Sequence, residues 1–513
     1  MAITPIGYQR LIERYQLPAM PLAQVAQIDT RVKGRESRTD GAVDQLLFES
    51  RYTPEPTLQE DLQFALRYEG VNLEVLELLF ARIESGVISG WLTAQRESAY
   101  ARRAGFLYEW ISGKELNIPE LSSRMSYVPA LDEDLQFGLG NTGEANSKFR
   151  VRNNLPGTRD FCPLVRKTAA IVEMQEQDLR ARARDTLSKY DPDLIRRASR
   201  YLYLKETHSS YEVEREKPSP ARAQRFVDLL KTANVGQPLS QERFVELQNA
   251  VIEPRWHEFA YRSRQNWVGS YHHNREVVDF VPPRPADVLP LMNGLCDYSA
   301  RIRDAASKNK ILDAVVHAAA LAFGFVFIHP FMDGNGRLHR YLIHEELSAL
   351  NFTPKGIVLP VSAFILAHID QYVNVLELFS KPRLLRTEFD PLLPDVPARG
   401  NDPLYFRFFD ATPQAMFLYR GLENTVMHDL RDEISYLIGL DRARAALKDE
   451  IDWPEQSLDR FINLVRQNDG TLSKTKRRSQ FDWMKDEEIA RFTPIVNEAF
   501  DTVESSESSH GQH

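Results

Sequence analysis

The chain has 513 residues, of which 43% are hydrophobic and 27% are charged, so it is long enough to form two or three hydrophobic cores. Its formal net charge of −8 argues against a dedicated nucleic-acid binder, which is usually basic over at least one whole domain. Two cysteines, Cys162 and Cys296, are too few for a disulfide framework or a four-thiolate zinc site.

Helical periodicity dominates the first 200 residues. Leu58, Leu62 and Leu66 share one helical face, and Leu73 and Leu76 begin a second face after a short turn. This spacing predicts two packed helices within an N-terminal helical region, residues 1–200. We expect an all-α fold for the chain as a whole.

The stretch NWVGSYHHNREVVDFVPP, residues 266–283, is the clearest β pattern. Turn-prone residues separate two short segments rich in β-branched and aromatic side chains, which predicts one small hairpin in an otherwise helical protein.

The longest apolar run, AVVHAAALAFGFVFIHPF, contains His317 and ends beside His329. It predicts a buried core helix rather than a membrane span, which needs about 18 to 20 consecutive apolar residues. The N-terminus also lacks the pattern of a secretory signal. A cytoplasmic protein without a membrane segment is therefore expected.

The stretch HPFMDGNGRLHR, residues 329–340, predicts a loop that leads into a helix. Gly334 and Gly336 allow main-chain N–H groups to approach an anion at the positive end of that helix. Arg337 and Arg340 are three residues apart, so their guanidinium groups can hold separate phosphates of one polyphosphate. The pattern predicts a phosphate-binding site.

Two further residues of this stretch suggest chemistry. Asp333 can hold a Mg²⁺ ion that bridges phosphate oxygens. His329, with an ordinary pKa of about 6.5, can act as the general base. Each residue alone is typical of ordinary structure, namely a buried histidine, a turn or a solvated helix face. Their combination in this order is what favours a functional site.

The Pro- and Gly-rich segment FDPLLPDVPARGNDP, residues 389–403, predicts a linker. A C-terminal helical domain is expected over residues 396–501, followed by a disordered polar tail, residues 502–513. The basic run from Lys474 to Arg478 is more typical of a solvated turn than of a DNA contact, so a surface for a partner or for dimer formation is at least as well supported.

The stretch HPFMDGNGRLHR resembles the signature of the Fic family, His-x-Phe-x-Asp/Glu-Gly-Asn-Gly-Arg-x-x-Arg, at every fixed position. The resemblance extends from about Tyr201 to Ser380. It implies a multi-helix catalytic core, residues 201–395, flanked by accessory helical regions like those of bacterial Fic proteins.

The resemblance implies a protein adenylyltransferase, which moves AMP from ATP to a Tyr, Thr or Ser hydroxyl of a target protein or of the chain itself. His329 would be the base and Asp333 would hold Mg²⁺. The residues implied in phosphate binding are Gly334, Asn335, Gly336, Arg337 and Arg340. Removal of AMP at the same site and a non-catalytic nucleotide sensor are the alternatives. The resemblance leaves a homo-oligomer open.

The resemblance also gives meaning to two other segments. Ser210 and Glu214 match the Ser/Thr-x-x-x-Glu motif of the family's inhibitory helix, here near residues 206–217, in which the glutamate pairs with Arg340. Arg215 departs from the Gly or Asn that follows in the family. The hairpin, residues 267–280, resembles the flap that docks the target by strand addition, through Trp267, Val268, Gly269, Val277 and Val278.

Overall fold

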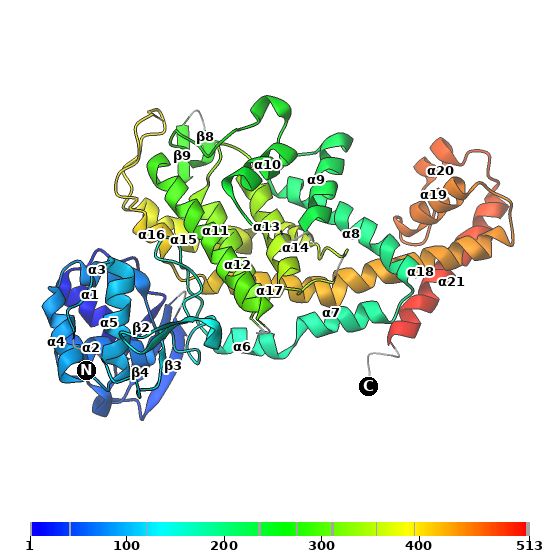
Figure 1. The fold of residues 1–513 in the computed structure, drawn as a ribbon. Helices are drawn as coiled ribbons and strands as arrows, with labels where there is room; N and C mark the ends of the chain where they lie inside the picture. The colour runs from blue at the N-terminus through cyan, green and yellow to red at the C-terminus, as the bar shows by residue number, and fades with distance from the viewer. Residues whose placement is uncertain are drawn as a thin grey trace.

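The computed structural model describes residues 3–40, 43–118, 121–233, 237–272, 275–308, 312–354, 356–393 and 395–508. These residues are mostly helical, which confirms the predicted fold class. Figure 1 shows an N-terminal lobe, a central group of helices, and a C-terminal lobe at the far end of the long helix α18 (Leu430–Lys448). Among the described residues, no helix has the length and apolar character that a membrane crossing requires.

The N-terminal lobe contains the two predicted helices, α2 (Leu58–Tyr68) and α3 (Leu73–Phe80), and the side chain of Asn72 caps the second. The other helices here are α1 (Gly7–Tyr15), α4 (Ser85–Ala94) and α5 (Ala99–Ser112). They surround a four-stranded sheet of order β1-β2-β4-β3, formed by Thr4–Pro5, Gln24–Ile28, Val43–Phe48 and Arg35–Asp40.

The prediction of a single hairpin was therefore wrong. A second small sheet in this lobe, of order β5-β7-β6, joins Val128–Pro129, Val151–Asn153 and Glu144–Asn146. The strand β3, RESRTD, has no apolar residue and exists through its antiparallel pairing with β4. Hydrophobic alternation cannot reveal such a strand, because no apolar side chains mark it.

The central helices position the predicted catalytic loop. Helix α12 (Ala314–Ile328) is buried at every residue but Val326, as its apolar sequence predicts, and it packs against α13 (Asn335–Ala349). Around this pair lie α6 (Ala169–Glu176), α7 (Leu179–Ser188), α8 (Pro192–Val213), α9 (Pro220–Thr232), α10 (Gln241–Val251), α11 (Pro285–Ser307), α14 (Val361–Ala367) and α15 (Ile369–Leu384). The predicted hairpin is present as β8 (Val268–His272) and β9 (Arg275–Phe280).

The segment after the Pro- and Gly-rich loop returns to the core instead of starting a separate domain. Helices α16 (Leu404–Arg407) and α17 (Thr412–Asn424) follow, and α17 packs on α12. The N–H of Leu164 donates to Phe409 O at 3.0 Å, and the N–H of Ala411 donates to Leu164 O at 2.8 Å. Val396, at the predicted boundary, lies in the exposed loop, but the apolar residues that follow the loop, such as Leu404, Phe406 and Phe409, are buried in the core.

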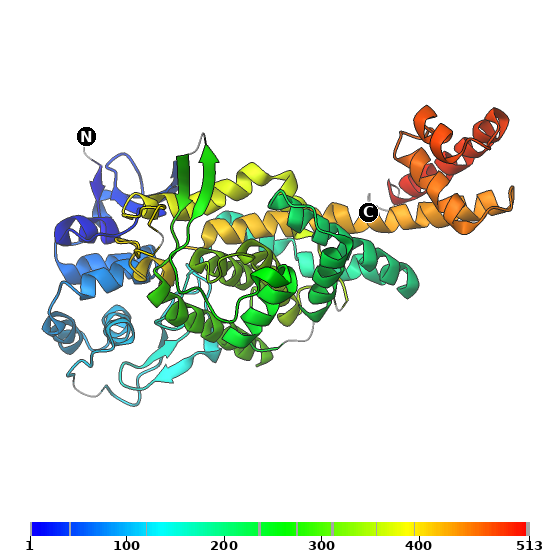
Figure 2. The same cartoon turned by 90° about the horizontal axis from the view of Figure 1, so that it is seen from above.

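A π-helical segment (Thr425–Asp429) joins α17 to α18, which extends to the C-terminal lobe of α19 (Glu455–Arg466), α20 (Lys474–Gln480) and α21 (Asp486–Ser508). Figure 2 shows these helices gathered at the end of α18, away from the N-terminal lobe. The helix α21 continues through residue 508 and so includes part of the predicted tail. Residues 509–513 lie outside the described residues.

Candidate active site

The loop between α12 and α13 is held by its own side chains. His329 ends α12 in the left-handed conformation, with a φ of 53°, and its N–H donates to Phe325 O at 2.9 Å. The ring of Phe331 is fully buried. The side chain of Asn335 accepts the Phe331 N–H at 3.0 Å and donates to the Phe331 carbonyl at 2.8 Å. The loop is thus pinned to the start of α13.

This arrangement leaves the predicted phosphate contact of Asn335 to its main chain. Both the oxygen and the nitrogen of its side-chain amide form hydrogen bonds with the main chain of Phe331, so the side chain stabilises the loop. Only the main-chain N–H of Asn335 is placed for an anion at the start of α13.

The contacts of His329 fix its tautomer. Its Nδ1 lies 3.1 Å from Val326 O, and a carbonyl oxygen can only accept a hydrogen bond, so Nδ1 carries the proton. Burial lowers the pKa of His329 to about 4, with a smaller lowering effect from the positive charge of Arg262, against the raising effects of Val326 O and Glu214. At neutral pH the ring is neutral and its Nε2 has a free lone pair. It can therefore accept a proton.

We expect His329 in the nucleotide-free chain to titrate near pH 4 rather than near its ordinary pKa of about 6.5. Because burial disfavours the charged imidazolium, the ring stays neutral as the pH falls through 6.5 and gains its proton only near the lowered pKa. NMR titration of the imidazole carbons, with His329→Ala to assign the signal, measures this midpoint. A midpoint at 6 or above would contradict the proposed environment.

The start of α13 has the features of an anion-binding helix terminus. Gly334 is the N-cap residue with a φ of 89°, and it provides no side-chain cap for the first-turn N–H groups. A Cβ atom at Gly336 would lie 2.4 Å from Oε1 of Glu214, so a larger residue there would push the carboxylate of Glu214 from its observed position. Unpaired first-turn N–H groups at a helix N-terminus can bind an anion, so phosphate binding here stays a prediction.

Glu214 occupies both predicted phosphate clamps. Its Oε1 lies 2.7 Å from Nη2 of Arg340, and its Oε2 lies 2.8 Å from Nε of Arg337. Arg340 also donates to Ser210, through Nε to Oγ at 2.7 Å and through Nη2 to the carbonyl at 2.6 Å. Both guanidinium groups are almost completely buried. The predicted pairing of Arg340 with Glu214 is present, and the bonds of Arg340 to Ser210 and the involvement of Arg337 go beyond it.

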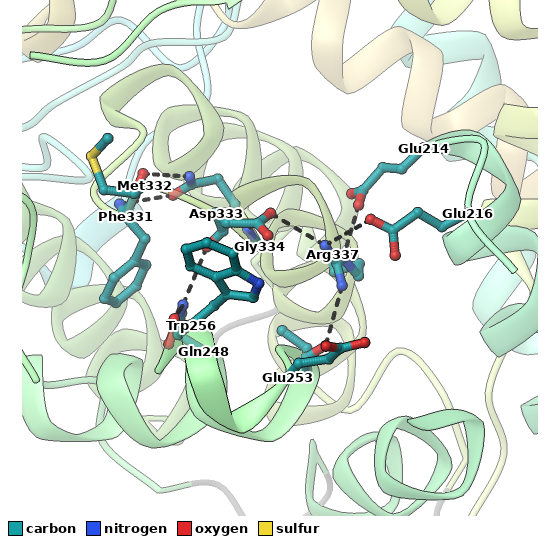
Figure 3. A network of polar contacts seen from close by, with 12 residues as sticks. Glu214, Glu216, Gln248, Glu253, Trp256, Phe331, Met332, Asp333, Gly334 and Arg337 are labelled. Carbon is teal, nitrogen blue, oxygen red and sulfur yellow. Dashed lines mark hydrogen bonds and ion pairs between the residues drawn. The ribbon is translucent and has the colours of Figure 1, made fainter. Parts of the chain in front are cut away.

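Arg337 has further partners that the sequence did not indicate. Figure 3 shows Glu214, Glu216 and Asp333 arranged around its guanidinium group. The Nη2 atom lies 3.5 Å from Glu216 Oε1 and 3.3 Å from Asp333 Oδ1, and Nη1 donates to Val251 O at 3.2 Å. Three carboxylates therefore surround this cation.

Asp333 lies at the rim of the site. Its Oδ1 accepts the N–H of Gly334 at 2.6 Å, and its side chain is 58% exposed. Among the described residues, no three metal-ligating side chains gather. A cation here would depend on nucleotide phosphates for further ligands, and an accessible carboxylate fits Mg²⁺ bound in that way.

The inhibitory segment ends earlier than predicted. Helix α8 stops at Val213, and Glu214 is its C-cap rather than a residue within a helix reaching 217. Arg215 has a φ of 58°, its N–H donates to Glu212 O at 2.8 Å, and the N–H of Glu216 donates to Tyr211 O at 3.0 Å. This is the Schellman arrangement, which favours Gly or Asn at the left-handed position. Here the left-handed position is occupied by Arg215, which is neither Gly nor Asn.

The hairpin lies next to the catalytic loop. Val268 pairs with Phe280 and Gly269 with Val278, and a bulge separates Val268 from Gly269. The side chain of Asn266, just before Trp267 and β8, donates to Phe331 O at 3.0 Å. Val268 and Val277 are exposed. The start of the predicted flap is thus bonded to the loop through Asn266, whereas target docking by the flap stays a prediction; residues 273 and 274 lie outside the described ones.

The segment before the hairpin contains residues that the sequence analysis missed. Arg262 donates to the carbonyl of His329 at 2.9 Å, and Glu258 accepts the N–H of Met332 at 3.0 Å. No local spacing connects these residues to the loop about 70 positions later; the only signal was that both lie within the stretch from Tyr201 to Ser380 that resembles the Fic family.

Comparisons with known proteins agree with this site. The model of the Fic/DOC family matches residues 238–347. A protein of *Nematostella vectensis* named "Protein adenylyltransferase Fic" is 37% identical over 95 residues, which are 18% of this chain and 19% of that protein. Its namesake from *Drosophila willistoni* is 31% identical over 100 residues, 20% of this chain and 17% of that protein. The match thus spans about a fifth of these relatives.

Solved structures of similar proteins include a Fic domain containing signaling protein from Bacteroides thetaiotaomicron, with 20% identity and a TM-score of 0.34 over 49% of this chain and 94% of that chain. A Fic family protein from Desulfovibrio desulfuricans has 17% identity and a TM-score of 0.34 over 61% of this chain and 87% of that chain.

Proposed function

We infer from the match of residues 238–347 to the model of the Fic/DOC family that this part of the chain is a Fic domain, and we propose that the chain is a protein adenylyltransferase that transfers AMP from ATP to a hydroxyl side chain of a target protein. The observation that carries the proposal is the position of a neutral histidine, His329, beside the uncapped start of α13 and its two buried arginines. The relatives named as protein adenylyltransferases match this same part of the chain.

The chemistry follows from the roles of these groups. Nε2 of His329 accepts the proton of a Tyr, Thr or Ser hydroxyl, and the resulting oxygen attacks the α-phosphorus of ATP. The bond from that phosphorus to the bridging oxygen breaks, and pyrophosphate leaves. The N–H groups at the start of α13 and the two arginines hold the phosphates in line. Mg²⁺, which Asp333 would hold, supplies positive charge to the phosphates.

The contacts of Glu214 support autoinhibition. A carboxylate paired with both Arg337 and Arg340 removes both phosphate clamps and places negative charge where the polyphosphate must lie. ATP must displace it to reach the reactive orientation, so the structure as described is the resting form.

Intact-mass spectrometry of the Glu214→Gly chain incubated with each nucleoside triphosphate and Mg²⁺ tests the proposed function. We expect a mass gain of one AMP with ATP, on the chain itself or on an added target. A gain of a different group would change the donor, and no gain with any donor would reject transfer. Loss of AMP from a previously modified target would instead support the reverse reaction.

The unusual turn after α8 gives a further prediction. Because Arg215 has a positive φ, Arg215→Gly should stabilise the inhibitory turn by about 1 kcal/mol, and basal AMP incorporation should fall about fivefold. Radiolabel incorporation measures this change. Gln16→Gly is the matched control, since Gln16 ends α1 with a φ of 49° far from the site; equal effects of both variants would argue against a specific role of the turn.

A further inference from the structure

Arg262 is buried against the catalytic loop, with 4% of its surface exposed. Its main-chain N–H donates to Pro330 O at 2.8 Å, and its Nε donates to His329 O at 2.9 Å. Its Nη2 donates to Pro283 O at 2.6 Å, and its Nη1 donates to Arg264 O at 3.1 Å. One guanidinium group therefore binds the main chain at three separate places.

Those three places belong to two elements of the proposed site, the catalytic loop and the base of the hairpin. The carbonyls of His329 and Pro330 belong to the catalytic loop, whereas Arg264 lies just before β8 and Pro283 just after β9. The strands leave the core between these two residues. The guanidinium thus ties the base of the hairpin to the catalytic histidine.

We propose that Arg262 is a positioning residue that sets the catalytic imidazole relative to the target-docking hairpin. The proposal rests on the adenylyltransferase function proposed above. The proposed role is alignment: Arg262 acts through His329, and among the described residues its hydrogen bonds go to His329, Pro330, Arg264 and Pro283 and not to the phosphate clamps. A planar fork of donors suits this task, because lysine cannot reach several carbonyls in fixed directions.

The energetic cost of burying the Arg262 guanidinium agrees with a positioning role for this residue. Burial lowers the pKa of Arg262 to about 9, and Glu258 provides the only opposing carboxylate effect. A buried cation whose bonds go to carbonyls is costly to maintain, and His329 itself is held at a positive φ, which few residues adopt. The positive charge of Arg262 also helps to keep the imidazole neutral, whereas Glu214 acts in the opposite direction.

The test compares Arg262→Lys and Arg262→Gln with Arg264→Gln, all in the Glu214→Gly chain with Mg²⁺ and ATP. Arg264 is the matched control, because its side chain is 58% exposed and pairs with Asp395. We expect kcat to fall about 10²-fold in both Arg262 variants, as for a misplacement of about 1 Å, with little change in the KM for ATP. The control should keep its kcat.

A second measurement separates alignment from general loss of structure and does not need turnover. In the chain with Glu214 intact, NMR titration should show a higher pKa of His329 in Arg262→Gln than in Arg262→Lys, which keeps the positive charge. An unchanged kcat in both Arg262 variants would overturn the proposal. It would also be overturned if the KM for ATP changed by as large a factor as kcat while the pKa of His329 stayed the same in both variants. If the Glu214→Gly parent is inactive, the proposed function fails while the titration still tests Arg262.

Discussion

Glu214→Gly is expected to raise AMP incorporation roughly 10²-fold above that of the unmodified chain, because restored alignment of bound phosphates has effects of that size. The carboxylate of Glu214 bridges Arg337 and Arg340. Its removal frees both guanidinium groups for the phosphates of ATP. Incorporation of labelled AMP, measured with saturating ATP and Mg²⁺, checks the expectation.

Glu212→Gly is the matched control for this variant. Glu212 lies two residues earlier on α8 with an exposed side chain, so the change introduces the same flexible residue without touching the arginines. If both variants gave the same rate, the increase would reflect a loosened helix end and not the loss of the carboxylate.

The melting temperature tests the contact between Glu214 and the two arginines independently of activity. Without Glu214, two buried cations lose their main counterion, so Glu214→Gly should lower the melting temperature of the nucleotide-free chain. ATP with Mg²⁺ should raise it again by more than in the unmodified chain, because the ligand now supplies the missing negative charge.

The sequence predicted the catalytic loop well because its residues are contiguous. His329, Asp333 and Arg340 lie within twelve positions, and short-range geometry decides what such a segment can bind. The pairing of Glu214 with Arg340 was also predicted, although it joins residues 126 positions apart, and only the family resemblance made that connection visible.

The features that were missed depend on tertiary contacts. The polar strand β3 forms because its backbone pairs with that of β4. The core continues to α17 because this helix packs on α12 and its Phe417 ring contacts Phe364 and Tyr372. The exact partner of the Asn335 side chain, the main chain of Phe331, depends on packing too, because a buried amide is placed where both of its ends can form hydrogen bonds.

Removal of the proposed base should have the largest negative effect. In the Glu214→Gly chain, His329→Ala should lower the rate of AMP transfer by about 10²–10⁴-fold, the usual contribution of a general base. Binding of ATP should persist, because Arg337, Arg340 and the first turn of α13 remain in place. Transfer rates and ATP affinity measured on the same preparation separate the two effects.

His208→Ala provides the comparison, since His208 lies exposed on α8 away from the loop and its loss should leave the rate unchanged. A His329→Ala chain that still binds ATP and still transfers AMP at the parent rate would show that another group takes the hydroxyl proton. A chain that binds ATP but transfers nothing would leave Nε2 of His329 as the acceptor, in agreement with the tautomer that Val326 fixes.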